Sequence, residues 1–347
     1  MTLSTPICAS ADPVSHPAPI LTVSDLRIET TGPQPAALLE SVSFDIRPGE
    51  TLALVGESGA GKSLSALAIL GLLPPDAMRV AAGQIHLGRT DLATLSARQM
   101  RAVRGGRVAM IFQDPLGCLN PVLTVGRQIT EALRLHKGLR GAAARARAVE
   151  LLELVRIPEP RKRLDEYPHR LSGGMRQRVM IAIALAGEPE LLLADEPTTA
   201  LDVTISTQII TLLRQLQADI GLSILMITHD LPAVRMIADR VAVMYSGRIV
   251  ETGIADAVFA APRHPYTQGL LSARPRGAIA AGAAPLTEIP GAVPQPNERP
   301  SGCTFRPRCP RASALCAQER PAMPPATSGS KAACHHAGTS TDHARAF

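Results

Sequence analysis

One stretch of sequence decides the fold: Gly56-Glu57-Ser58-Gly59-Ala60-Gly61-Lys62-Ser63. It fits the pattern GxxxxGK followed by Ser or Thr, and it lies between an apolar strand-like run at 51–55 and a helix-like run at 64–72. Glycines in such a loop let backbone N–H groups close around the phosphates of a nucleotide at a helix N-terminus. Lys62 then supplies a positive charge, and Ser63 supplies a hydroxyl for Mg²⁺. The stretch predicts a phosphate-binding loop (P-loop) in an α/β fold.

A second strand-like run, residues 191–194, ends in two adjacent carboxylates, Asp195 and Glu196. Alone this is weak evidence, because many buried strands end in an acid. Beside a P-loop we interpret the run as the second strand of the phosphate site. Asp195 is then expected to hold hydrated Mg²⁺, and Glu196 to accept a proton from the attacking water. The chain leaves the pleat at the end of a strand, so both side chains can face one site.

A third motif opens a helix that is expected to run to residue 186. It consists of Leu171, Ser172, Gly173, Gly174, Met175, Arg176 and Gln177. Ser172 is a candidate N-cap, and the two glycines expose backbone N–H groups. By itself the motif is equally compatible with an ordinary capped helix.

The three motifs together resemble the ATP-binding cassette (ABC) family in their order and approximate spacing. The resemblance covers about residues 20–273. It implies an α/β P-loop NTPase fold, with a RecA-like core and a helical subdomain at about 115–186. It also implies that ATP and Mg²⁺ are the cofactors and that the chain is an ATPase coupled to transmembrane transport.

The resemblance assigns further residues. Gln113 is similar to the family's Q-loop glutamine, which reaches Mg²⁺ and the γ-phosphate, and His229 is similar to the switch histidine. Both are expected to act in catalysis beside Glu196. The D-loop at the dimer interface is represented by Ala200, Leu201 and Asp202. In the family two cassettes face head to tail, so the third motif is expected to close over the nucleotide of a second cassette.

One feature departs from the family pattern. The family stacks adenine on an aromatic side chain roughly 25 residues before the P-loop, but Thr30 stands near that position and no aromatic residue precedes Phe44. Weaker or less base-selective adenine binding is therefore expected. The phosphate contacts are intact, so ATP binding itself is still predicted.

Composition limits the function classes. The chain has 347 residues, of which 46% are hydrophobic and 19% charged, which argues against whole-chain disorder. Two compact units, or one large domain with an appendage, are expected. Aromatic residues make up only 2%, which argues against base-stacking platforms. The net charge is +6, and the basic excess between residues 98 and 178 suits a partner surface, a membrane headgroup zone, nucleic acid or merely a solvated face.

The chain divides into a core and a tail. We expect a disordered tail at 1–19, the nucleotide-binding domain at 20–273, a Pro/Ala/Gly-rich linker at 274–300, a small four-cysteine module at 301–336 and a second tail at 337–347. No apolar run reaches 18 residues, and no secretory signal is evident. The expected location is peripheral, on the cytoplasmic face of the inner membrane.

Two C-terminal motifs narrow the subfamily. HPYTQGLL at 264–271 and GCTFRPRCP at 302–310 resemble the ATPase subunits of di- and oligopeptide importers, a group that also includes nickel importers. The resemblance implies two transmembrane permease subunits, a second and different ABC ATPase, and, indirectly, an extracytoplasmic substrate-binding protein. No nucleic-acid partner is expected. The cargo stays open among dipeptide, longer peptide and nickel.

An alternative from another class is a soluble ABC ATPase that acts on DNA or the ribosome. The single cassette and the HPYTQGLL segment argue against it. A regulatory module with a dead ATPase site is a third reading, but it predicts the loss of Lys62 or Glu196, and both are present.

Four cysteines follow the Pro-rich segment: Cys303, Cys309, Cys316 and Cys334. Zinc sites more often show CxxC pairs, which are absent here, whereas looser spacing can hold an iron–sulfur cluster. The resemblance implies a 4Fe-4S cluster for some members of the subfamily. A zinc site that includes His335 and His336, or no metal at all, also stays open. Cys8 and Cys118 have no nearby partner and are expected to be plain thiols.

Overall fold

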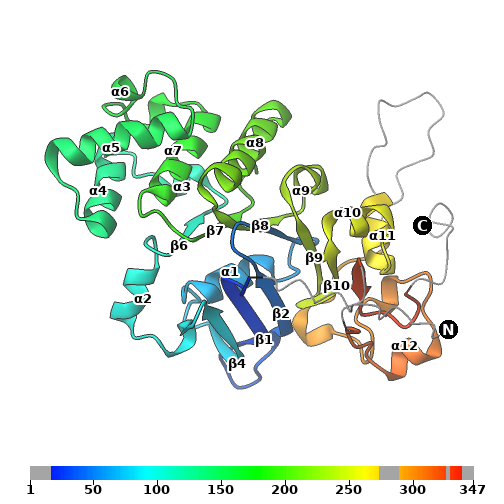
Figure 1. Cartoon of the computed structure of the whole chain (residues 1–347). Helices are drawn as coiled ribbons and strands as arrows, with labels where there is room; N and C mark the ends of the chain where they lie inside the picture. Colours follow the sequence, from blue (N-terminus) through cyan, green and yellow to red (C-terminus); the bar gives the residue numbers. More distant parts are fainter. Residues whose placement is uncertain (1–16, 200, 273–288, 326–328, 338–347) are drawn as a thin grey trace, which may run out of the picture.

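The computed structural model describes residues 17–199, 201–272, 289–325 and 329–337, and its main sheet runs through the middle of the molecule (Figure 1). The strand order is β11-β10-β9-β3-β8-β7-β6, in which β9, β3, β8, β7 and β6 are parallel and β10 and β11 antiparallel to their neighbours. The strands are β3 (Thr51–Val55), β6 (Val108–Ile111), β7 (Leu191–Asp195), β8 (Ser223–Thr228), β9 (Arg240–Tyr245), β10 (Arg248–Ile254) and β11 (Ser330–Ala332). This agrees with the predicted α/β core.

A second sheet, which the sequence did not predict, is antiparallel and lies against the first. Its strands are, in order, β2 (Ala37–Ile46), β1 (Leu21–Thr30), β4 (Met78–Leu87) and β5 (Thr90–Asp91). The β-rich runs at its start were visible in the sequence, but β4 is mostly exposed and carries no clear alternation of apolar and polar residues. Which strands pair with which was therefore not readable.

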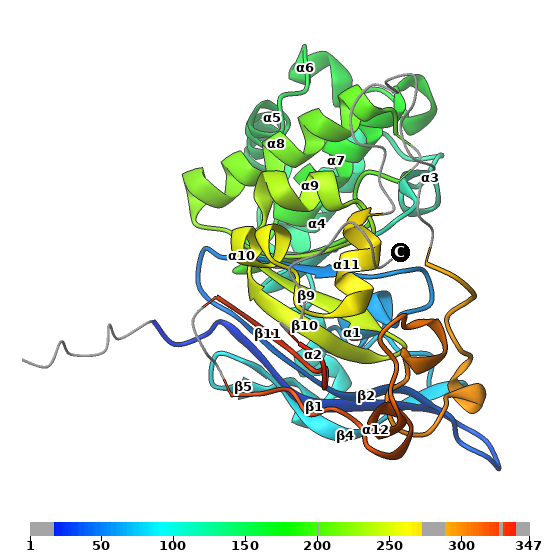
Figure 2. The same ribbon diagram turned by 90° about the vertical axis from the view of Figure 1, so that its right-hand side faces the viewer.

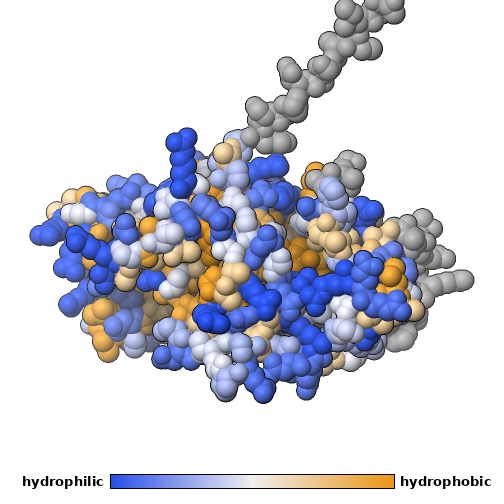
Figure 3. Space-filling view, turned by 90° about the horizontal axis from the view of Figure 1, so that it is seen from below, coloured by the Kyte–Doolittle hydropathy of each residue, from blue (hydrophilic) through white to orange (hydrophobic). Residues whose placement is uncertain are grey.

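Helices lie beside the main sheet, including a group at one end of the molecule and others in the C-terminal segment. They are α1 (Lys62–Ile69), α2 (Ala97–Val103), α3 (Pro115–Cys118), α4 (Val125–Lys137), α5 (Gly141–Leu154), α6 (Pro160–Arg163), α7 (Gly173–Leu185), α8 (Val203–Ile220), α9 (Leu231–Ile237), α10 (Ala255–Ala260), α11 (Pro265–Ser272) and α12 (Ala314–Gln318). Helices α3 to α7 gather at one end of the molecule, between β6 and β7 in the chain (Figure 1). The face seen from below mixes hydrophilic and smaller hydrophobic areas (Figure 3), as expected of a surface in water.

Successive residues of the central strands serve different cores. Leu191 and Leu193 pack with the antiparallel sheet and α1, whereas Leu192 and Ala194 pack with the helical end and α8. This follows from the period of two in a strand. Because β7 is buried on both faces, its sequence is continuously apolar rather than alternating.

The C-terminal segment is joined to the main sheet rather than standing apart. Its strand β11 pairs with β10, and Phe305 packs between Tyr245 and Tyr266, with ring centroids 5.1 and 5.4 Å away. Figure 2 shows this segment beside β10 and α11. Aromatic pairs of this kind contribute roughly 0.5–1.5 kcal/mol beyond their burial. Of the expected linker, the structure describes residues 289–300.

The HPYTQGLL motif forms α11, and its first residues cap that helix. The carboxylate of buried Glu251 accepts the backbone N–H groups of Arg263 and His264, each at 2.8 Å. The His264 ring accepts the N–H of Tyr266 at 3.0 Å through Nδ1. Groups that are otherwise unpaired at a helix start are thereby satisfied.

His264 gives the fold a measurable pH dependence. Complete burial of the ring lowers the pKa of His264 to about 3. The pKa of His in an unfolded chain is about 6.5. Below that pH the unfolded chain binds a proton that the folded chain does not, so the free energy of unfolding decreases as the pH is lowered. At pH 5 the loss is about 2 kcal/mol.

The amide oxygen of Asn can replace Nδ1 as the acceptor. We therefore expect the free energy of unfolding of His264→Asn to fall by about 2 kcal/mol less than that of wild type when the pH is lowered from 7.5 to 5. Urea unfolding at both pH values measures this. Burial raises the pKa of Glu251, which acts in the opposite direction, but Glu251 is present in both proteins. Equal losses in the two proteins would show that His264 is not the titrating group.

Candidate active site

The P-loop joins β3 to α1, as the sequence predicted. Gly56 has φ +159° and Gly61 has φ +101°; a side chain at Gly56 would collide with the carbonyl of Met244, and one at Gly61 with Leu39. Both positions therefore need glycine because of close packing. The loop is held against the turn after β9, where the N–H of Gly247 donates to the Ala60 carbonyl at 2.9 Å.

Lys62 is buried and reaches back across the loop. Its Nζ donates to the carbonyl oxygens of Gly56 at 2.9 Å and Glu57 at 3.0 Å. Burial lowers the pKa of Lys62, and the charges of Glu196, Asp195 and Glu57 oppose that shift. A cation held in this position attracts phosphate oxygens that enter the loop.

Ser63 and Asp195 face each other at the start of α1 and the end of β7. The Ser63 hydroxyl donates to Asp195 Oδ1 at 3.0 Å. Burial raises the pKa of Asp195, and the nearby charge of Glu196 raises it further, while Ser63 and Lys62 oppose the shift. Two hard oxygen ligands, one of them a carboxylate whose charge is disfavoured, fit the requirements of Mg²⁺.

Glu196 is the centre of a polar network. It adopts φ +46°, so the chain turns sharply where β7 ends. Its Oε2 accepts from Gln113 Nε2 at 2.9 Å and from the Thr199 hydroxyl at 2.8 Å, and its Oε1 lies 3.2 Å from His229 Nδ1. The structure thus brings together three residues that the sequence placed in one site. Thr199 opens the stretch Thr199-Ala200-Leu201-Asp202 that carries the resemblance to the D-loop, but no contact with Glu196 was predicted for it.

The environment keeps Glu196 ionised. Burial by itself raises its pKa, but hydrogen bonds from Thr199 and His229, with the charges of His229 and Lys62, bring it below the ordinary value. An ionised carboxylate with its neighbours already oriented is suited to accept a proton.

The four C-terminal cysteines also converge. Cys303, Cys309, Cys316 and Cys334 line one small cavity together with His335 and His336. Burial, together with the charges of the other three sulfurs, raises the pKa of Cys309 to about 11. In the described part of the chain, however, no group of three or more His, Cys, Asp or Glu is placed to hold a metal ion. Cys118 is an exposed free thiol, whereas Cys8 lies outside the described residues.

Comparison with known proteins decides the family. Residues 39–199 match the family described as ABC transporter, and residues 250–316 match the oligopeptide/dipeptide transporter C-terminal region. A putative peptide import ATP-binding protein of Brucella abortus is 52% identical over 308 residues, which is 88% of this chain and 92% of that protein. The chain belongs to the ABC transporter family. This confirms the resemblance found in the sequence, and the site is that of an ABC ATPase.

Other relatives and solved structures agree. The dipeptide transport ATP-binding protein DppD of Escherichia coli is 49% identical, with 87% of this chain and 91% of that protein covered. An ATP-binding cassette, MJ0796, solved as a dimer in a post-hydrolysis state with ADP and Pi, gives a TM-score of 0.60 at 27% identity, with 68% of this chain and 98% of that chain covered. The cbiO1 protein of Clostridium perfringens also gives a TM-score of 0.60, at 28% identity, with 70% of this chain and 91% of that chain covered.

The third motif of this ABC ATPase lies at the start of α7. The Ser172 hydroxyl accepts the N–H of Met175 at 3.3 Å, so Ser172 is the predicted N-cap. Ser172 and Gly173 are exposed, whereas Leu171, Gly174 and Gln177 are buried. Arg176 donates to the Pro168 carbonyl, within the helical end. Among the hydrogen bonds of the described residues, none joins this motif to the P-loop.

The predicted D-loop lies beside the same motif. Leu201 faces Gly173, where an added Cβ would lie 3.3 Å from its side chain, and Asp202 caps α8 by accepting the N–H of Ile205 at 2.9 Å. Ala200 lies outside the described residues. No helix of the described chain is long and apolar enough to cross a membrane.

The pairing of Ser63 with Asp195 yields a prediction. We expect Ser63→Ala to weaken Mg²⁺-dependent ATP binding about tenfold, because one oxygen ligand of the cation is lost. ATP binding in EDTA should not change. Equilibrium dialysis with labelled ATP measures both, and Thr94→Ala, which removes an exposed hydroxyl outside the P-loop, is the control. The same loss with and without Mg²⁺ would contradict the assigned role.

Proposed function

We propose that the chain is the ATP-hydrolysing subunit that powers import of dipeptides and oligopeptides through separate transmembrane subunits. The proposal is supported by the names of relatives at about half identity and by the match of residues 250–316 to the peptide transporter C-terminal region. Those names favour peptide over nickel as cargo. The chain's own part in this function is to bind ATP and hydrolyse it.

The observation that carries the ATPase role is the network around Glu196. We infer that Glu196 is the general base that takes a proton from the attacking water, because its carboxylate is ionised and stands beside the P-loop lysine. Gln113 and His229 hold that carboxylate from two sides and are placed to sense the γ-phosphate. Bound Mg²⁺, held by Ser63 and Asp195 and approached by Gln113, would neutralise phosphate charge.

A second cassette is part of the proposal. Ser172 and Gly173, at the start of α7, are exposed. The N-terminus of this helix is therefore accessible to a nucleotide on a facing subunit. The solved relative MJ0796 is itself dimeric. The resemblance favours a second, different ATPase subunit over a second copy of this chain.

A surface groove supports contact with the permeases. It is lined by apolar residues from both sides of the junction between the cassette core and the helical end, among them Leu72, Phe112, Leu119 and Met180. Leu72 and Phe112 are each 39% exposed. Phe112 directly precedes Gln113, so a permease segment seated in the groove would be one residue from the ATP site. This would place the chain on the cytoplasmic face of the membrane, and an extracytoplasmic binding protein would act only through the permeases.

The iron–sulfur cluster is a separate part of the proposal. It is supported by the convergence of the four thiols on one cavity, since such clusters are held by cysteine thiolates. The ATPase chemistry above makes no use of it.

Replacement of Glu196 tests its role as the general base. We expect Glu196→Gln to bind ATP at wild-type affinity while hydrolysis falls by about three orders of magnitude, because the base is removed and the phosphate cradle is kept. Steady-state phosphate release measures this, with Glu150→Gln, a surface carboxylate of α5, as the control. Unchanged hydrolysis would remove Glu196 from the mechanism.

The same variant tests the transport role. Tagged Glu196→Gln, trapped with ATP in detergent-solubilised membranes, should co-purify with two multi-span subunits and a second cassette protein, identified by mass spectrometry. Ribosomal or nucleoprotein partners instead would overturn the import function but leave the ATPase chemistry standing.

The cluster has its own test. Protein purified without oxygen should contain about four iron atoms and be brown, and Cys309→Ser should lose much of both the iron and the colour while ATP binding stays. Cys118→Ser, which removes an exposed thiol elsewhere, should change neither. Colourless, iron-free wild-type protein would reject the cluster.

A further inference from the structure

Glu57, the second residue of the P-loop, is held by the C-terminal part of the chain. Arg308 donates from its two terminal nitrogens to the two carboxylate oxygens of Glu57, at 2.7 and 3.1 Å. The backbone N–H of Glu57 donates to the Tyr266 hydroxyl at 2.8 Å. One P-loop residue is therefore fixed through both its side chain and its backbone, by residues more than 200 positions away in the chain.

Arg308 is itself rigidly seated. Its side chain is 6% exposed, its Nε donates to the Pro290 carbonyl at 2.8 Å, and its guanidinium lies 5.7 Å from the centre of the Tyr245 ring. A second donation reaches the Ile289 carbonyl at 3.3 Å. This planar fork, matched to one carboxylate, is a geometry that lysine cannot reproduce.

The position of Glu57 creates an electrostatic problem for ATP. A carboxylate inside a phosphate-binding loop repels the triphosphate and competes with it for Lys62, whose positive charge Glu57 helps to stabilise. The bidentate pair with Arg308 weakens both effects, because the guanidinium charge opposes that of the carboxylate and engages both of its oxygens.

We propose that Arg308 is a positioning residue of the ATP site: by clamping Glu57 it makes the C-terminal segment necessary for tight ATP binding. The proposal rests on the function assigned above, in which this loop binds ATP. It also gives the GCTFRPRCP motif, which contains Arg308, a role that does not depend on any metal.

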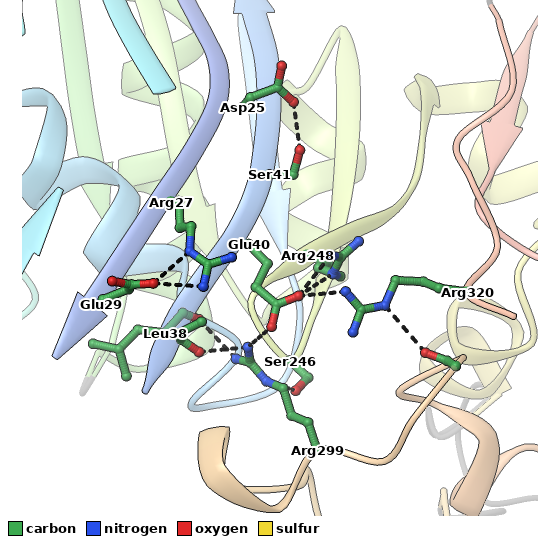
Figure 4. Close-up of polar contacts among 12 residues, drawn as sticks. Asp25, Arg27, Glu29, Leu38, Glu40, Ser41, Ser246, Arg248, Arg299 and Arg320 are labelled. Carbon is green, nitrogen blue, oxygen red and sulfur yellow. Dashed lines mark hydrogen bonds and ion pairs between the residues drawn. The ribbon is translucent and has the colours of Figure 1, made fainter. Parts of the chain in front are cut away.

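A second contact of the same segment provides a matched control. Glu40, on β2, is bound by Arg248, Arg299 and Arg320, with Arg320 at 2.7 Å (Figure 4). Arg320, like Arg308, comes from the C-terminal segment and meets a carboxylate of the cassette. Its loss leaves Glu40 with two arginines, and Glu40 lies outside the P-loop, so no charge is uncovered at the phosphate site.

The test is the MgATP dissociation constant of the full chain, measured by isothermal titration calorimetry. We expect Arg308→Gln to weaken binding about tenfold, and less at high salt, where the repulsion is screened. Arg308→Lys should recover part of the loss, and Glu57→Gln combined with Arg308→Gln should return to within about threefold of wild type, because no uncompensated carboxylate is left. Arg320→Gln should bind like wild type.

Two outcomes would overturn the proposal: wild-type affinity in Arg308→Gln, or a double variant no better than Arg308→Gln, which would mean that Arg308 acts only through folding. If Arg308→Gln does not fold, the comparison of Arg308→Lys with the double variant decides the same point. Failure of the wild-type chain to bind MgATP would instead refute the proposed function.

Discussion

The site depends on the parallel pairing of three neighbouring strands. Val55 of β3 lies opposite Thr228 of β8, and Ile227 of β8 lies opposite Asp195 of β7, so all three strands end at one edge of the sheet. The P-loop, His229 and the two carboxylates each lie at or just after one of those ends. Because parallel strands have their carboxyl ends on the same edge, their pairing brings these groups together at one edge of the sheet.

The phosphate site brings like and unlike charges close together. The shifts in pKa follow from the balance between burial and these charge interactions. Buried Lys62 is surrounded by Asp195, Glu196 and Glu57, which support its charge against burial. Asp195 and Glu196 differ, because Asp195 is the more buried and has one hydroxyl partner, whereas Glu196 has several donors. Two adjacent carboxylates thereby have pKa values shifted in opposite directions, upward for Asp195 and downward for Glu196.

The sequence predicted what short-range geometry determines. The glycine positions of the P-loop, the Ser172 cap and the end of β7 are encoded within a few residues, and the structure has all three. It did not predict the antiparallel sheet or the pairing of β11 with β10, because strand partners far apart in the chain leave no local signal. The contact between Glu57 and Arg308 was missed for the same reason, although each residue lies in a motif that had been recognised.

Aromatic residues pack the C-terminal motifs against the cassette. Tyr245, Tyr266 and Phe305 form one cluster, and two of them come from those motifs. The cluster fixes α11 and the segment around Arg308 against β9, whose following turn supports the P-loop. A loop rich in glycine is held in place by its surroundings rather than by its own side chains. The C-terminal motifs therefore hold the P-loop through Tyr266 and Arg308, which both bind Glu57.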